Sequence, residues 1–129
     1  MQSPAEVTLQ ALTEWDIVNV EWPGFVGREP VSPPANVITI YDTGGMPPAQ
    51  VEAGLRQPTV QVRVRSQTYK AAWEKANEIL TRLGVEWSKV YDLNRVVGFF
   101  PQGDIFFLGR DSDELYQFTL NFRLMRDQS

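Results

Sequence analysis

The clearest hydrophobic pattern in this chain lies over residues 59–83, where its period changes from two to about 3.6 without a spacer. Apolar and polar residues alternate over 59–66, which is typical of a strand with one buried face. Over 67–83 apolar residues recur at helical spacing, which indicates an amphipathic helix with Ser66 as N-cap and Gly84 as C-terminal residue. The expected apolar stripe of this helix is Tyr69, Ala72, Trp73, Ala76, Ile79 or Leu80, and Leu83. The pattern therefore predicts a strand that leads directly into a helix packed back onto the same sheet.

The remaining patterns predict a short helix and further strands. Ser3 followed by Pro4 is typical of a helix start, so a helix is expected over 5–15. Strand patterns cover 17–22, 37–41, 96–100, 105–108 and 116–124. The last of these alternates over its whole length, which indicates an antiparallel strand with one buried face. Because the turn sequence 101–104 separates two of the strands, those two are expected to pair as a hairpin.

Two segments rich in proline and glycine interrupt these elements, over 23–36 and over 42–58, and a turn is expected over 42–45. Long ordered loops are uncommon in small domains unless they have a use, so both segments are expected to reach a neighbouring copy or a partner. The order of elements predicts a single α+β domain over 1–129. Its expected form is a mainly antiparallel sheet with one long amphipathic helix and a short N-terminal helix packed on one face.

The face of the sheet away from the helices is expected to be open. The valines of strand 59–66 point towards the helix, so Gln61, Arg63 and Arg65 lie on the opposite face. Arg123 of the last strand extends this basic row. Charged groups need water, an acidic partner or another subunit, and the row also suits contact with phosphate groups. A merely solvated face is an equally common arrangement.

Composition narrows the chemistry that the chain can perform. It contains no cysteine and no histidine, which removes the thiolate nucleophile, the usual general base near neutral pH and the usual zinc ligand. A generic hydrolase, a metal site and a cofactor are therefore not expected. The net charge of -4 argues against a protein that coats nucleic acid. Apolar runs are shorter than the roughly 18 residues of a membrane span and no signal peptide is evident, so a soluble, unexported protein without a membrane partner is expected.

One acidic motif is a candidate for catalysis. Asp42-Thr43-Gly44 follows strand 37–41 and resembles the catalytic loop of retroviral-type aspartic proteases, in which Asp42 carboxylates from two copies share one proton. The chain then breaks away through Gly45 and two prolines, and the helix over 67–83 has no place in that all-β fold. An ordinary turn is favoured, and the protease is kept as a minority alternative.

Two tryptophans are candidates for different roles. Trp73 belongs to the helical stripe and is expected in the core. Trp22 precedes Pro23, Gly24 and Phe25 at the start of an irregular segment, where a large aromatic side chain is a candidate interface anchor.

Several segments, taken in order, carry a resemblance to a known family. They are residues 38–45, 56–65, 69–73, 107–111 and 118–123. Together they resemble the minor capsid or tail terminator family of long-tailed bacteriophages, over roughly residues 8 to 126.

The resemblance implies a structural assembly protein without catalysis. Members of that family are small α+β proteins that form a hexameric ring on the finished tail tube and present a surface to the head connector. The implied partners are further copies of the chain in a homo-hexamer, the tail tube protein and the head–tail connector protein, with passing contact to DNA in the ring lumen. The implied location is the head-proximal end of the virion tail, after synthesis in the host cytoplasm. A head–tail adaptor of the head-completion type is the main alternative. The residues expected at interfaces are Trp22, Phe25, Arg28, Asp42, Met46, Arg56, Arg63, Arg65 and Arg123.

Overall fold

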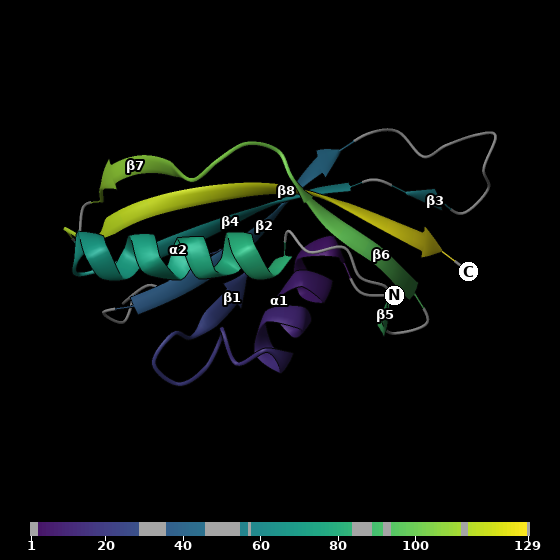
Figure 1. Ribbon diagram of the computed structural model, residues 1–129, viewed down its shortest axis with the longest axis horizontal. Helices are drawn as coiled ribbons and strands as arrows, with labels where there is room; N and C mark the ends of the chain where they lie inside the picture. The colour runs from purple at the N-terminus through teal and green to yellow at the C-terminus, as the bar shows by residue number, and fades with distance from the viewer. Residues whose placement is uncertain are drawn as a thin grey trace.

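The computed structural model describes residues 3–28, 36–45, 55–56, 58–83, 89–91, 94–111 and 114–128. The helices are α1 (Pro4–Glu14) and α2 (Tyr69–Leu83). The strands are β1 (Gly24–Val26), β2 (Asn36–Gly45), β3 (Leu55–Arg56), β4 (Pro58–Ser66), β5 (Lys89–Tyr91), β6 (Asn94–Pro101), β7 (Phe106–Arg110) and β8 (Tyr116–Gln128). All the strands in these ranges belong to one sheet of order β1-β2-β4-β8-β6-β5, with β3 and β7 also paired to β8 (Figure 1).

Helix α1 confirms the helix predicted near the N-terminus. Ser3 accepts a hydrogen bond from the Glu6 backbone N–H, and the Glu6 carboxylate accepts one from the Ser3 backbone N–H, which completes a capping box. Pro4 lies in the first turn, where its missing N–H is not needed. The buried side of the helix consists of Ala5, Val7, Thr8, Ala11 and Leu12.

The strand predicted over 17–22 is wrong, because Asn19 closes a compact turn there. Its side-chain oxygen accepts hydrogen bonds from the backbone N–H groups of Glu21 and Trp22, both at 3.0 Å. Its side-chain nitrogen donates to the carbonyl of Asp16 at 2.8 Å. These local bonds replace those that a strand would make with a neighbour. The first strand is β1, which begins only after Pro23.

The predicted fold class is also wrong, because the sheet is mixed and carries more strands than expected. Strand β1 runs parallel to β2, with Phe25 opposite Thr39, whereas β2 and β8 run antiparallel to β4. In the described residues the protein is thus sheet-rich, with a mixed sheet and two helices of 11 and 15 residues, instead of a mainly antiparallel sheet with one long amphipathic helix. Strand direction depends on how the connecting segments cross the sheet, which the alternation of side chains does not encode.

The hairpin predicted around 101–104 does not form. Strand β6 pairs with the second half of β8, and β7 pairs with its first half, so the two strands lie end to end along one edge of β8. Between them, the Gln102 backbone N–H bonds to the Asn121 carbonyl at 2.8 Å. Strand β8 is 13 residues long and can pair with both.

The turn predicted over 42–45 is a continuation of β2, which runs to Gly45 with an irregularity in its pairing after Asp42. The N-cap prediction for α2 is corrected as well. Thr68 accepts a hydrogen bond from the Ala71 backbone N–H at 3.2 Å, while Ser66 donates its hydroxyl hydrogen to the Asn36 side chain. The predicted C-terminal residue, Gly84, lies outside the described residues.

The core lies between the sheet and the two helices, and Figure 1 shows α2 running along the sheet. Register places Val62 opposite Leu120 and Val64 opposite Phe118, so the apolar rows of β4 and β8 share one face. Helix α2 covers this face with Ala72, Ala76, Ile79 and Leu83. Trp73, which was expected in the core, is instead 41% exposed. Its position marks the outer limit of the helical stripe.

Candidate functional site

The arginines predicted on the outer face of the sheet lie on neighbouring strands and pack against their own chain. Arg63 of β4 is paired with Thr39 of β2 and with Thr119 of β8. Its guanidinium carbon lies 5.3 Å from the centre of the Tyr41 ring, a cation–π contact. Arg123 of β8 lies at the same distance from the ring of Phe100 on β6. Both side chains are half-buried, so the row is less open than the sequence pattern indicates.

Arg65 has an acidic partner within the same chain. Its side chain is only 3% exposed and forms an ion pair with Asp111, in which Nε donates to Oδ2 at 2.7 Å. Asp111 also accepts a hydrogen bond from the Leu115 backbone N–H at 2.9 Å. The pair therefore ties the connection between β7 and β8 to the C-terminal end of β4. Charge-assisted bonds of this kind are among the stronger hydrogen bonds in proteins.

Asp42 caps a helix in this structure. Its carboxylate oxygen Oδ1 accepts a hydrogen bond of 2.9 Å from the backbone N–H of Ala5, in the first turn of α1. A carboxylate at this position complements the positive end of the helix dipole. The hydrogen bond gives Asp42 a structural role that needs neither a second copy nor a shared proton.

The remaining predicted interface residues differ in their surroundings. Trp22 belongs to the core cluster, and Lys75 Nζ lies 5.2 Å from the centre of its ring, so little of this ring is available to another molecule. Arg28 is exposed just after β1. Arg56 belongs to β3, and its backbone is paired with Arg126 of β8. Met46 lies outside the described residues. Phe25 lines a groove beside β1.

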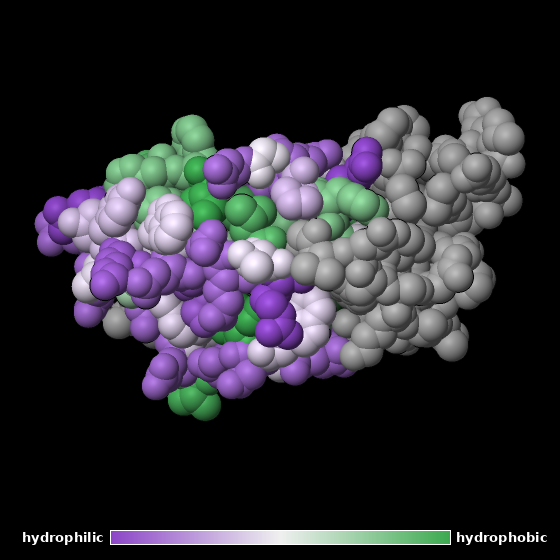
Figure 2. Space-filling view, viewed as in Figure 1, coloured by the Kyte–Doolittle hydropathy of each residue, from purple (hydrophilic) through white to green (hydrophobic). Residues whose placement is uncertain are grey.

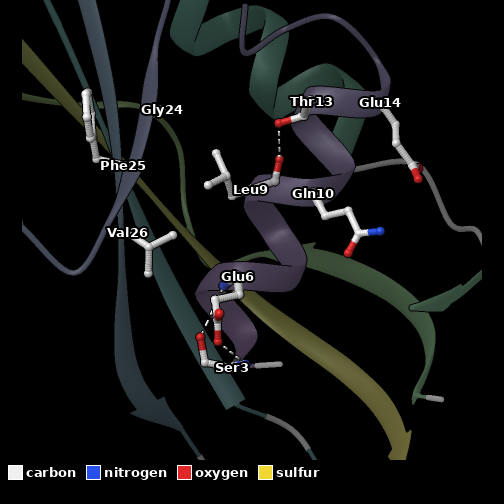
Figure 3. A pocket seen from close by; sticks show the side chains of 9 residues that line it. All are labelled: Ser3, Glu6, Leu9, Gln10, Thr13, Glu14, Gly24, Phe25 and Val26. Carbon is white, nitrogen blue, oxygen red and sulfur yellow. Dashed lines mark hydrogen bonds between the residues drawn. The ribbon is translucent and has the colours of Figure 1, made fainter. Parts of the chain in front are cut away.

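That groove lies between α1 and β1 and has a volume of about 880 Å³. Leu9 and Val26 point into the space between the helix and the strand, and Figure 3 shows the Glu6 and Glu14 carboxylates along the helix that forms its other wall. The residues that line the groove are Ser3, Glu6, Leu9, Gln10, Thr13, Glu14, Gly24, Phe25 and Val26. This set contains two acidic residues and no basic ones. The groove therefore combines an apolar floor with an acidic rim.

Sequence reasoning missed a cluster of exposed apolar side chains at the opposite edge of the sheet. Phe106 is 61% exposed, and the cluster continues along β7 and onto the first turns of α2 (Figure 2). We call it the aromatic edge, and it consists of Tyr69, Trp73, Phe106, Phe107 and Leu108. The Tyr69 and Phe107 rings meet edge to face, with centroids 5.5 Å apart. The sequence does contain a signal for this cluster. Phe106, Phe107 and Leu108 are consecutive apolar residues, and neighbouring residues of a strand point to opposite faces, so they cannot all face one core.

In the part of the chain that the structure describes, reactive or metal-binding side chains are not gathered into a cluster. Within that part, no group of three or more acidic residues is placed to hold a metal ion. Neither α1 nor α2 has the length and apolar character needed to cross a bilayer. The candidate site is accordingly a set of surfaces: the arginines on the outer face of the sheet (Arg63, Arg65 and Arg123), the α1–β1 groove and the aromatic edge.

Comparison with known proteins identifies one family. A family model described as "Bacteriophage tail terminator protein" matches residues 9–128, nearly the whole chain. Among curated proteins, no match was found.

Proposed function

Because the chain belongs to the bacteriophage tail terminator family, which gives it a structural role in phage tail assembly, we propose that it caps the tail tube as a ring of identical subunits. In this proposal the ring is a homo-hexamer at the head-proximal end of the tail. Its free surface receives the connector of the head, and DNA passes through its lumen. The single observation that carries the proposal is the family match over residues 9–128.

The surfaces of the described residues favour assembly over catalysis. An exposed aromatic edge and an apolar groove are features of proteins that bind other proteins. Asp42, the candidate for protease chemistry, is bonded to the start of α1. We therefore propose a protein that acts through contacts and not as an enzyme.

A tube-capping assay tests this proposal. The purified chain is mixed with polymerising tail tube protein, and tube lengths are measured in negatively stained images. A terminator is expected to stop tube growth and to appear as a ring at one tube end. A head–tail adaptor is expected to leave tube length unchanged and to bind the head connector instead. Unchanged tubes without bound rings would reject the terminator function.

A mass measurement tests the ring independently. Light scattering on the chain, alone and bound to tubes, is expected to give six copies per ring. A closed ring uses two different patches of each subunit, so the mass should stop increasing at one closed size. A dimer that neither grows on tubes nor caps them would contradict the ring.

A further inference from the structure

The two exposed apolar surfaces lie at opposite edges of the same sheet. Within the described residues, β1 pairs only with β2, and β7 pairs only with β8, so each strand has one unpaired side. In Figure 1, β7 runs along the top of the sheet and β1 along its lower side. Unpaired strand edges carry free backbone donors and acceptors and readily accept another strand.

Register connects the two edges in one cross-strand row. Phe106 of β7 is opposite Thr119, and Phe25 of β1 is opposite Thr39. Arg63 of β4 lies between those two threonines. Directly paired residues lie on the same face, so Phe106 and Phe25 end the same row on the same face of the sheet. A second sheet placed edge to edge would bring these two phenylalanines together on the face away from the helices. Phe107 is opposite Phe118 and packs against Tyr69, so it lies on the helix face, where α1 borders the groove.

Charge and apolar area are complementary between the two edges. Arg110 ends β7 and is half exposed, with its guanidinium 5.2 Å from the centre of the Tyr116 ring. It also pairs with the exposed Glu114 carboxylate at 3.7 Å, a surface contact that contributes little and that a stronger acidic partner can replace. The groove beside β1 has Glu6 and Glu14 on its rim. An aromatic edge that ends in a cation therefore faces, on the next copy, an apolar groove bordered by anions, which favours one orientation of contact.

We propose that β7 of one copy pairs along β1 of the next copy, with the aromatic edge covering the α1–β1 groove. The occupant of the groove is thus a second copy of this chain. The contact is head to tail, since it joins two different patches, and repeated contacts of this kind close into a ring when the rotation between copies allows it. The pairing is the subunit contact of the ring proposed above and so depends on that proposed function for its biological role.

Cross-linking through introduced cysteines tests the pairing, because the chain has no cysteine of its own. Leu108→Cys places a thiol on the aromatic edge, and Gln10→Cys places one in the groove. The two variants are mixed, with and without tail tubes, and treated with a short bis-maleimide. We expect a mixed dimer from this pair and a ladder of species from the chain that carries both changes.

The matched control is Val20→Cys, since Val20 is an apolar residue that is 98% exposed and does not line the groove. Mixed with Gln10→Cys, it should give about tenfold less product, because only held contacts raise the local thiol concentration. Absence of the mixed dimer, both with and without tubes, would overturn the pairing. A main product of two Leu108→Cys chains would also overturn it, since that product means edge-to-edge contact of identical patches.

A charge exchange provides a second readout on the same contact. Arg110→Glu is expected to reduce the yield of the mixed dimer several-fold, and adding Glu14→Arg in the partner variant should restore it. If Arg110→Glu leaves the yield unchanged, the orientation inferred from charge is wrong.

Failure of the pairing and failure of the proposed function give different results. If the chain caps tubes but gives no mixed dimer on them, the ring uses other surfaces. If the mixed dimer forms but tubes grow unhindered, the pairing stands and the capping function is rejected.

Discussion

Single residues show how a regular pattern can mislead about exposure. Alternation along β4 places Arg65 on the face away from the helices, and the structure agrees with that side. It is nevertheless almost completely buried, because Asp111 arrives from the β7–β8 connection 46 positions later. Such a long-range partner leaves no local signal in the sequence around Arg65.

Replacing Arg65 should destabilise the fold more than replacing an exposed cation. Arg65→Met leaves Asp111 as a largely buried charge without its partner, so we expect a loss of about 3 kcal/mol in the free energy of unfolding. Urea titration measures this loss. Adding Asp111→Leu should recover part of it, since the remaining charge is then removed as well.

Lys70→Met is the matched control for that change. Lys70 pairs with Glu74 at 3.9 Å, but both side chains are mostly exposed. The expected change is below about 0.5 kcal/mol. A loss as large as that of Arg65→Met would show that burial is not what gives the Arg65 pair its importance.

Asp42 gives a second prediction at this scale. Asp42→Ala removes the acceptor for the Ala5 backbone N–H, and we expect a loss of about 1 kcal/mol in unfolding free energy with normal tube capping. Asp42→Asn keeps an acceptor oxygen and should lose less. Complete loss of a peptide-cleaving activity in Asp42→Asn, with the fold intact, would instead support the protease alternative.

At the scale of elements, side chains from α1 and from the turn after it pack directly against Gly24 of β1. A Cβ atom added at Gly24 would lie 2.6 Å from Leu9 Cδ1 and 3.0 Å from Val18 Cγ1. The sequence marked Gly24 only as part of a break after Pro23, whereas the structure makes it the first residue of a strand. The close approach sets the wall of the α1–β1 groove.

Gly24→Ala should therefore force the Leu9 side chain to move. We expect a loss of about 1 kcal/mol in unfolding free energy, at the low end for overpacked sites, because only the end of a side chain has to move. We would measure the unfolding free energies of Gly24→Ala, Leu9→Ala and the double variant by thermal or urea unfolding. The three values separate the cost of the added methyl group from the cost of the lost leucine. The double variant should be more stable than the sum of the two losses predicts, because Leu9→Ala makes room for the new methyl group. Strict additivity would contradict the close contact.

At the scale of the whole molecule, the outer face of the sheet is either a docking surface for a partner or a face that contacts only water, and reversing its charge tests which it is. Arg63 and Arg123 lie half-buried on that face, each against an aromatic ring. If the face contacts a partner in the ring, Arg63→Glu together with Arg123→Glu should reduce tube capping about tenfold or more by reversing the local charge. The unfolding free energy should fall by only about 1–2 kcal/mol through the lost ring contacts.

Arg82→Glu is the control for this pair of changes. Arg82 lies 5.1 Å from the centre of the Trp15 ring, so it loses the same kind of contact at a different place on the molecule. It should leave capping unchanged. Normal capping by the Arg63 and Arg123 double variant would show that the outer face is solvated.

The sequence by itself determined the elements that bury one side regularly, and it determined the family. The pattern predicted β4, α2 and β8 close to their observed bounds, because alternation or a helical stripe follows directly from burying one face. The ordered segments 38–45 and 118–123, with the others, indicated the tail terminator family that the match over residues 9–128 confirms.

Only the tertiary structure decided how those elements pair and which side chains remain exposed. It placed β1 parallel to β2, set β6 and β7 end to end along β8, and left Trp73 at the surface while burying Arg65. Each of these outcomes depends on residues far apart in the chain, and periodicity describes only how neighbouring residues share one face. Pairing direction and exposure are set where distant segments meet, so they become visible only in three dimensions.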